Sequence, residues 1–301
     1  MIETFQKQAE NVYILKPIFD RSEGASAEEI RALVESAGGK VCGIKTQVVR
    51  EVNPATFIGS GKLEEIKEEL SDSPADLIVF DGELSPSQTL NIRAALGVDV
   101  IDRTTLILDI FALNAKSTEG KLQVELAQLK YIYPRLRGKG AELSRQGGGI
   151  GTRGPGETQL ESDRRHIRRR IDFLENALKN IETRRNLQNL RRKKNNIKTV
   201  ALVGYTNTGK STLLNRLTGA DVFVKNQLFA TLDPTMRKLP LKNCEVVLSD
   251  TVGFVRNLPH NLIEAFKSTL ETAVNADLIL IVCDATGDYE MQLETTENTL
   301  A

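Results

Sequence analysis

The chain has 301 residues, of which 40% are hydrophobic and 27% are charged, and its acidic and basic side chains balance. This length suffices for about two or three domains, and the composition excludes disordered and fibrous classes. No apolar run approaches the ~18 residues of a membrane span, and the first residues lack the basic start and apolar centre of a signal peptide. We therefore expect a cytoplasmic protein with no membrane span.

The neutral net charge conceals a basic middle. From Arg135 to Lys198 the chain carries 18 Lys or Arg residues against 7 Asp or Glu, whereas the remainder carries 22 against 33. A basic middle between acidic ends predicts a polyanionic partner, for which nucleic acid is the obvious candidate.

Residues 1–115 alternate strand-like and helix-like patterns. Strands are expected at 12–19, 40–52, 76–80 and 98–101, and helices at 63–70, 86–96 and 104–113. A further helix is expected to open at a capping box, Ser26-Ala-Glu-Glu29, and to end at Gly38-Gly39. Such alternation predicts a small α/β domain with a largely parallel sheet.

The loop from Asn53 to Lys62 ends in Gly-Ser-Gly-Lys and precedes a helix pattern. Two interpretations remain open: a tight turn leading into a capped helix, or a second phosphate-binding site. The turn is favoured because the longer glycine loop and the following Ser or Thr are both missing.

Residues 116–196 contain two helix patterns that predict an antiparallel hairpin. Apolar residues recur at spacings of three and four in both. The first stripe is Leu122, Leu126, Leu129, Tyr133 and Leu136, and the second is Ile167, Ile171, Leu174, Leu178 and Ile181. The outer face of the second helix is crowded with arginine. It is either a solvated face or an RNA-binding surface, and its one-sided charge favours an anionic partner.

Between these helices, residues 137–157 contain eight glycines and four basic side chains. Such a segment buries too little apolar surface to hold one conformation, so we expect a mobile tip. A flexible linker is the alternative, but a linker needs no arginine, and we favour ordering of the tip on RNA phosphates. The candidate RNA-binding residues of the tip and hairpin are Arg137, Lys139, Arg145, Arg153, Arg164, Arg165, Arg168 and Arg169.

Residues 197–301 open with the most informative stretch. The apolar run 200–203 predicts a buried strand, Gly204–Ser211 fits G-x-x-x-x-G-K-[ST], and a helix pattern follows. In that context backbone N–H groups of the loop and the helix dipole bind phosphate. Lys210 is expected to reach the β- and γ-phosphates and Ser211 to ligate Mg²⁺. The alternative, a glycine turn before a surface helix, is much less favoured.

The residues after this loop supply the other parts of a phosphate-hydrolysing site. A strand at 244–249 leads to Asp250-Thr-Val-Gly253, in which Asp250 is expected to hold Mg²⁺ and Gly253 to face a γ-phosphate. The polar segment 229–237 is expected to be a switch loop, with Thr231 as the Mg²⁺ ligand and Thr235 in reserve. A strand at 278–283 completes a P-loop domain with a mainly parallel sheet.

Taken together, these segments resemble the HflX-type GTPases of the translation-factor-related class along the entire chain. The resemblance is carried by the residues at 54–62, 147–165, 203–215, 229–235 and 249–254. It implies a GTPase that binds the ribosome, chiefly the large subunit and its RNA, and that separates idle or stalled ribosomes into subunits. It also implies that the basic hairpin enters ribosomal RNA near the peptidyl-transferase centre.

The resemblance also assigns residues to the nucleotide site. Catalysis is expected to involve Lys210, Thr231 and Gly253, and the Mg²⁺ ligands are expected to be Ser211, Thr231 and Asp250. The full set expected to bind GTP or GDP is Gly204, Tyr205, Thr206, Asn207, Thr208, Gly209, Lys210, Ser211, Thr212, Phe229, Ala230, Thr231, Leu232, Asp233, Asp250, Thr251, Val252 and Gly253.

Two positions near the phosphates modify these expectations. Phe254 stands where Ras-like enzymes carry the glutamine that orients the attacking water, so we expect slow intrinsic hydrolysis that the ribosome stimulates. Asn207 matches the position through which related GTPases recruit K⁺, which makes K⁺ a second expected cofactor beside Mg²⁺.

Guanine recognition rests on the resemblance alone. Neither an N/T-K-x-D segment nor an S-A-K-like loop occurs before Ala301. We expect this to reflect truncation, with an incomplete nucleotide domain that binds GTP weakly. Besides a monomeric ribosome-stimulated GTPase, two alternatives stay open: an RNA-binding protein in which hydrolysis is incidental, and a P-loop ATPase.

Overall fold

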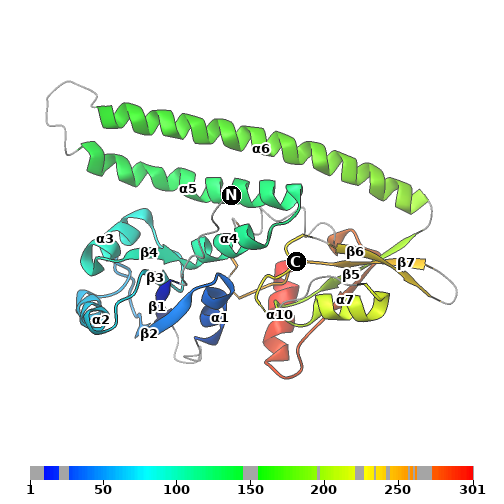
Figure 1. Cartoon of the computed structure of the whole chain (residues 1–301), viewed down its shortest axis with the longest axis horizontal. Helices are drawn as coiled ribbons and strands as arrows, with labels where there is room; N and C mark the ends of the chain where they lie inside the picture. The colour runs from blue at the N-terminus through cyan, green and yellow to red at the C-terminus, as the bar shows by residue number, and fades with distance from the viewer. Residues whose placement is uncertain are drawn as a thin grey trace, which may run out of the picture. The chain divides into compact units, whose positions relative to one another are not determined.

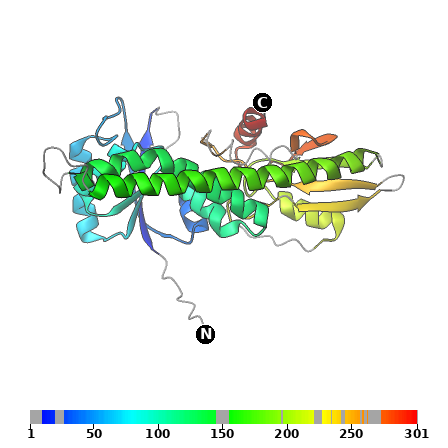
Figure 2. The ribbon, with the colours of Figure 1, turned by 90° about the horizontal axis from the view of Figure 1, so that it is seen from above.

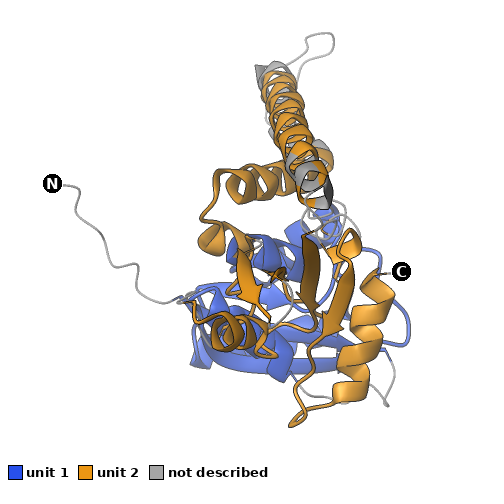
Figure 3. Ribbon diagram, turned by 90° about the vertical axis from the view of Figure 1, so that its right-hand side faces the viewer, with its two compact units in different colours: residues 1–110, 137–146 blue, residues 111–136, 147–301 orange. Residues whose placement is uncertain are grey.

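The computed structural model describes residues 10–19, 27–144, 155–194, 197–220, 227–233, 235–241, 245–256, 258–259, 262 and 273–300. The side chains at 137–144, 155–160, 186, 188–189, 191 and 193–194 are not described. The chain divides into two compact units, residues 1–110 with 137–146 and residues 111–136 with 147–301 (Figure 3). Within the described residues, every helix is too short or too polar to cross a membrane.

The first unit is built on a four-stranded parallel sheet (Figure 1). The strands are β1 (Asn11–Ile18), β2 (Lys40–Val48), β3 (Leu77–Phe80) and β4 (Asp99–Asp102), in the order β2-β1-β3-β4. The helices are α1 (Glu28–Ser36), α2 (Ser60–Asp72), α3 (Pro86–Leu96) and α4 (Arg103–Asn114), of which α4 continues into the second unit. The expected α/β architecture with a parallel sheet is confirmed.

The core of this sheet follows the two-residue alternation of its strands. On one face, Leu15 and Phe80 pack with Ile66 of α2 and Ile92 of α3. Their neighbours of opposite parity, Ile14 and Val79, are also fully buried, as expected for strands covered on both faces.

Two details of this unit differ from expectation. Strand β2 ends at Val48 instead of 52, because the side chain of Asn53 accepts from the N–H groups of Ala55 and Thr56 and turns the chain. The N-cap of α1 is Ala27, which makes no side-chain cap hydrogen bond, and Ser26, the first residue of the capping box expected at 26–29, lies outside the described residues. A capping box forms at Ser85 and Gln88 of α3.

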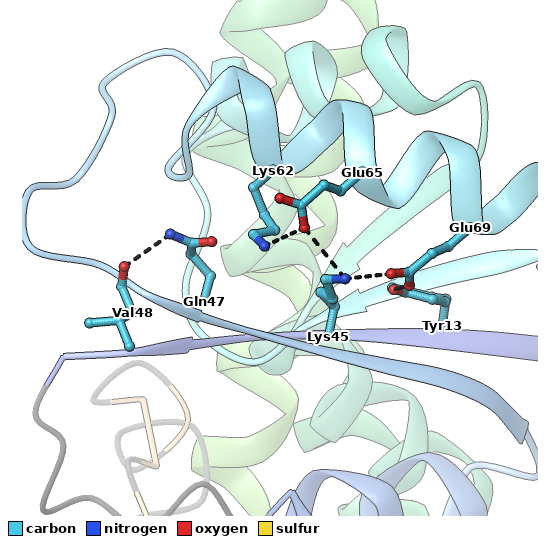
Figure 4. Close-up of polar contacts among 7 residues, drawn as sticks. All are labelled: Tyr13, Lys45, Gln47, Val48, Lys62, Glu65 and Glu69. Atoms are coloured by element: carbon cyan, nitrogen blue, oxygen red, sulfur yellow. Dashed lines mark hydrogen bonds and ion pairs between the residues drawn. The ribbon is translucent and has the colours of Figure 1, made fainter.

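A charged cluster joins α2 to the sheet (Figure 4). The carboxylate of Glu69 accepts from the hydroxyl of Tyr13 and pairs with Lys45, while Glu65 pairs with Lys62 at 2.5 Å and with Lys45 at 3.4 Å. The pKa of Tyr13 is raised, mainly by burial and to a smaller extent by the Glu69 carboxylate. Lys45 first, and Tyr13 second, lower the pKa of Glu69. The Gly59–Lys62 segment opens this helix, with Gly59 as its N-cap.

The helical hairpin is formed by α5 (Thr118–Ser144) and α6 (Pro155–Lys194), and all of it except residues 137–144 belongs to the second unit. The two helices run side by side over residues 118–136 of α5 (Figures 1 and 2). Ion pairs bridge them: Arg170 donates to Glu125 at 2.6 and 2.7 Å, Lys130 pairs with Glu175 at 2.7 Å, and Arg185 pairs with Glu119. All five apolar positions expected on α6 are buried or half-buried.

Both helices extend into the segment that was expected to be a mobile tip. We expected a mobile tip at 137–157, but the backbone of 137–144 continues α5 and that of 155–157 opens α6. Gly138 and Gly140 disfavour a helix, but Lys139, Ala141, Glu142 and Leu143 are good helix formers, and an existing helix extends more easily than a new one nucleates. Residues 145–154 lie outside the described part of the chain.

The same unit carries a second sheet, of strands β5 (Lys198–Val203), β6 (Thr235–Pro240), β7 (Glu245–Asp250) and β8 (Leu278–Ile281). Its order is β6-β7-β5-β8, and only the edge strand β6 pairs antiparallel. Helix α7 (Lys210–Thr218) packs Leu214 on one face against Leu202 and Leu248. On the other face, Val203 packs with Phe254. Helix α10 (Tyr289–Leu300) follows β8. The mainly parallel sheet of a P-loop domain is confirmed.

Candidate nucleotide site

The glycine loop lies between β5 and α7, as the motif predicts. The strand ends at Val203 and the helix begins at Lys210, with Gly209 as its N-cap in a left-handed conformation, φ 88°. Inside the loop, the hydroxyl of Thr208 donates to the carbonyl of Tyr205 at 2.9 Å. These elements bring the first N–H groups of a helix and a compact loop to one point, which is the arrangement that binds anions.

Lys210 is held inside this loop. Its side chain is 6% exposed, and its Nζ donates to the carbonyls of Gly204 at 3.1 Å and Tyr205 at 2.6 Å. Burial lowers the pKa of Lys210 to about 8, and the nearby Asp250 carboxylate opposes this shift. A buried ammonium with little compensating charge favours an anionic ligand, which would raise that pKa again.

Three oxygen-bearing side chains converge beside the loop. The hydroxyl of Ser211 lies 2.5 Å from Oδ2 of Asp250 and 3.0 Å from the hydroxyl of Thr231. Asp250 is fully buried, burial raises its pKa, and its Oδ1 has no hydrogen-bond partner among the described residues. A buried carboxylate oxygen of this kind favours a cation. One carboxylate and two hydroxyls are the hard oxygen ligands that suit Mg²⁺, so these residues fit the expected metal.

Gly253 sits where the D-x-x-G segment crosses the glycine loop. A Cβ at this position would lie 2.5 Å from Cα of Thr206 and 3.0 Å from its backbone nitrogen. The two segments are also joined by backbone bonds, from Thr206 N–H to the Phe254 carbonyl at 2.7 Å and from Phe254 N–H to the Gly204 carbonyl at 3.1 Å. Only glycine allows this approach. The backbone of Gly253 thereby lies beside a cavity that residues of the glycine loop and of 227–231 also line.

Phe254 points into the core of the second sheet. Its ring is 2% exposed and packs with Ala201, Val203 and Ala273 in the core of the second sheet. The position after D-x-x-G therefore offers no polar side chain to an attacking water.

The segment that was expected to be a switch loop contacts the glycine loop through Phe229 and Thr231. The N–H of Phe229 donates to the hydroxyl of Thr206 at 2.8 Å, and Thr231 reaches Ser211. Thr235, the reserve Mg²⁺ candidate, opens β6 and pairs opposite Asp250 in the ladder. The structure thus brings Thr231, not Thr235, to the Ser211 hydroxyl.

The expected residues divide into two groups. Those lining the cavity are Thr206, Asn207, Gly209, Lys210, Ser211, Thr212, Phe229, Ala230, Thr231, Thr251 and Gly253, together with Gln227, which sequence reasoning missed although it lies just before the switch segment. Tyr205, Leu232 and Val252 have buried side chains outside that lining, and Gly204, Thr208 and Asp250 also lie outside it. Asp233 instead bonds to residues 116 and 117.

The candidate RNA-binding residues are only partly described. Arg145 and Arg153 lie outside the described residues, and of Arg137 and Lys139 only the backbone is described. On α6, Arg165, Arg168 and Arg169 are exposed. Arg164 is half-buried, with its guanidinium 5.4 Å from the centre of the Tyr133 ring.

Comparison with known proteins places this site in a family. Residues 24–112 match the family described as GTP-binding GTPase N-terminal, residues 114–192 match GTP-binding GTPase Middle Region, and residues 199–301 match 50S ribosome-binding GTPase. Among solved structures, the GDP complex of SsGBP is 31% identical, with a TM-score of 0.55 over 96% of this chain and 76% of that one. A GTP-binding protein of Sulfolobus solfataricus in complex with GDP is 30% identical, with a TM-score of 0.50 over the same shares.

Curated relatives agree. GTPase HflX of Caldanaerobacter subterraneus is 54% identical over all of this chain and 71% of its own length. GTPase HflX of Alkalihalophilus pseudofirmus is 55% identical over 90% of this chain and 64% of its own length, and that of Escherichia coli is 49% identical over 88% and 62%. The chain thus spans about two thirds of the length of these relatives. It belongs to the GTPase HflX family.

Proposed function

We propose that this protein binds GTP with Mg²⁺, hydrolyses it slowly on its own, and uses the nucleotide cycle to act on the large ribosomal subunit. The observation that carries the proposal is the meeting of Ser211, Thr231 and Asp250 beside a phosphate loop, with one carboxylate oxygen left unpaired. The family membership supports guanine as the base.

Each residue has a defined task in this proposal. The loop N–H groups and Lys210 would hold the phosphates, and Ser211, Thr231 and Asp250 would hold the metal, which would supply positive charge to offset that of the phosphates. Thr231 lies on the switch loop, so its ligation depends on the γ-phosphate. Gly253, which lines the cavity, would offer its N–H to that phosphate.

Slow hydrolysis follows from the position of Phe254. Because its ring is buried in the core, no side chain at this position orients the attacking water. K⁺ is a candidate for the missing positive charge, with Asn207, which lines the cavity, as its ligand. Equal hydrolysis rates in K⁺ and Na⁺ buffers, with and without ribosomes, would exclude that role.

Replacement of the Ser211 hydroxyl tests the metal site. Loss of one buried hydrogen-bonded ligand of a charged group is worth about 1.5–3 kcal/mol, so Ser211→Ala is expected to weaken Mg²⁺-dependent GTP hydrolysis by about 10- to 100-fold. Ser71→Ala is the matched control, because that hydroxyl donates only to the carbonyl of Lys67 in α2. Unchanged hydrolysis in Ser211→Ala would contradict the assignment.

The ribosomal role of the hairpin rests on the exposed arginines of α6. Arg170 and Arg185 are engaged by Glu125 and Glu119, so their charge serves to join the helices. Among the described residues no ion pair involves Arg165, Arg168 or Arg169, which leaves their charge available to RNA phosphates. The family description, 50S ribosome-binding GTPase, supports the large subunit as the partner.

A charge-matched pair of variants tests this surface. Replacing Arg165, Arg168 and Arg169 by Gln is expected to weaken large-subunit binding. The slope of log affinity against log salt is expected to fall by roughly 0.7–0.9 for each phosphate that is no longer neutralised. The control replaces Arg93, Arg237 and Lys238, which belong to α3 and β6 and not to the hairpin helices. If both triple variants keep the wild-type slope, the RNA contact lies elsewhere.

We further propose that, in the cytoplasm, the protein acts as a monomer and separates ribosomal subunits. The burial of Phe254 favours a second candidate, an RNA-binding protein in which the nucleotide only sets affinity and hydrolysis is incidental. A non-hydrolysable GTP analogue distinguishes the two. If one round of subunit separation proceeds as well with the analogue as with GTP, hydrolysis serves only release.

A further inference from the structure

The switch loop is held by residues that precede the hairpin. Asp233 accepts from the backbone N–H of Lys116 at 3.0 Å, from the N–H of Ser117 at 2.7 Å, and from the hydroxyl of Ser117. Four residues earlier, the carbonyl of Phe229 accepts from Nδ2 of Asn114 at 2.9 Å. We name residues 114–120 the anchor segment. It lies in the same compact unit as the switch loop, about 115 positions away in sequence.

Phe229, which opens the switch loop, has a disfavoured backbone. Its φ is 56°, a left-handed conformation that is unfavourable for a bulky side chain by about 1–2 kcal/mol. Three contacts retain it: the N–H bond to Thr206, the carbonyl bond from Asn114, and a perpendicular ring contact with Phe111 at 4.7 Å between centroids. One contact comes from the phosphate loop and two from the end of α4. Strain held by contacts on both sides is typical of switch regions.

Gly120 makes room for this arrangement. A Cβ on Gly120 would overlap Oδ1 of Asp233, and its N–H donates to the Ser117 hydroxyl at 2.8 Å. Glycine lowers the stability of a helix, so the helical conformation of α5 does not explain a glycine at this position. Its position is explained by the approach of the Asp233 carboxylate.

We propose that the anchor segment is a positioning element for GTP hydrolysis, which holds the switch loop from both ends so that Thr231 meets Ser211 and Asp250. This inference rests on the function proposed above. Asn114 fixes the loop at Phe229, two residues before Thr231, and Ser117 fixes it at Asp233, two residues after. A loop pinned on both sides of its metal ligand loses little further entropy when the ligand engages.

The same contacts couple the hairpin to the nucleotide. Helix α5 begins at Thr118, inside the anchor segment, and Arg185 of α6 pairs with Glu119 in its first turn. A displacement of the hairpin therefore reaches the switch loop directly. By linkage, RNA bound to the hairpin and GTP bound to the loop change each other's affinity by the same factor.

Asn114→Asp tests the first pin. The change is nearly isosteric but turns the donor facing the Phe229 carbonyl into an acceptor. We expect kcat for GTP hydrolysis to fall about tenfold, whereas Kd for Mg·GDP stays within twofold, because Thr231 engages only with the γ-phosphate. Asn91→Asp is the matched control: Asn91 donates from Nδ2 to the Ala55 carbonyl at 2.8 Å, in the other unit. A merely structural defect would change kcat and Kd together.

Gly120→Ala tests the second contact, between Ser117 and Asp233. Alanine favours the α5 helix but displaces the Asp233 carboxylate, so the expected result is slower hydrolysis without loss of helix stability. Gly61→Ala, in α2 with open space around the added methyl, is the control. In both anchor variants, the ratio of ribosome affinities with a GTP analogue and with GDP is expected to approach one.

Hydrogen–deuterium exchange separates this inference from the proposed function. Amides of residues 227–233 are expected to exchange faster in both anchor variants than in wild type, in nucleotide-free protein and with a GTP analogue. If wild-type protein fails to hydrolyse GTP, the proposed function fails, but the exchange result still decides the positioning role. Wild-type exchange and wild-type kcat in both variants would overturn the inference.

Discussion

Gly253→Ala is the most direct test of the packing at the site. The added Cβ would lie 2.5 Å from Cα of Thr206, whereas two carbon atoms in contact lie about 3.5–4.0 Å apart. The neighbour is backbone, so no side-chain rotation relieves the overlap, and the D-x-x-G segment must separate from the glycine loop by about 1 Å. This movement would break the bond from Thr206 N–H to the Phe254 carbonyl.

We expect Gly253→Ala to destabilise the nucleotide-binding domain by about 1–3 kcal/mol, as overpacked cores do, and to weaken Mg·GDP binding at least tenfold. Hydrogen–deuterium exchange of β5 and β7 measures the first effect, and titration with a fluorescent GDP measures the second. Gly61→Ala is again the control, and it is expected to stabilise α2 by about 0.5–1 kcal/mol. If Gly253→Ala keeps both the exchange protection and the affinity of wild type, the close approach is not required and the reasoning fails.

Three further substitutions, one in the phosphate loop and two at charged side chains elsewhere, are expected to have measurable effects. Lys210→Ala is expected to abolish nucleotide binding or hydrolysis but to leave RNA affinity of the hairpin intact, as measured by nucleotide titration and large-subunit pelleting. Arg103→Met removes a buried guanidinium that pairs with the half-buried Asp81 and Glu29, and it is expected to destabilise the first unit by about 3 kcal/mol in urea. Arg93→Met, at the exposed pair with Asp99, is expected to cost less than about 1 kcal/mol. Bonds from Thr199 N–H first, and from Lys198 and the Thr199 hydroxyl next, lower the pKa of Asp277 from 3.8 to about 2. A depressed carboxylate pKa contributes stability above about pH 4 that is lost as the pH falls toward 2, so the melting-temperature difference between wild type and Asp277→Asn is expected to shrink over that window; a constant difference would contradict it.

Sequence patterns were sufficient for the parts of this protein that depend on neighbouring residues. The loop Gly204–Ser211 is predictable because the strand, the glycines and the helix that shape it are contiguous in sequence. The parallel sheet of 1–115 is predictable because strand patterns alternate with helix patterns along the chain. The apolar stripe of α6 was predictable because it depends only on the spacing of apolar residues along the helix. A local signal can also be overlooked: the Ser85 and Gln88 side chains form a capping box at the start of α3, which the sequence pattern at 85–88 already contains.

The meeting of distant segments depends on the tertiary structure. The choice of Thr231 over Thr235 depends on β6, which takes Thr235 into its ladder with Asp250. Oδ1 of Asp250 has no hydrogen-bond partner among the described residues because the surrounding segments bury it, and a sequence motif does not predict such burial. The hydrogen bonds of Asn114 and Ser117 to the switch loop join residues more than 110 positions apart. Closing so long a loop of chain costs conformational entropy, which is offset only when the sheet and the hairpin have formed.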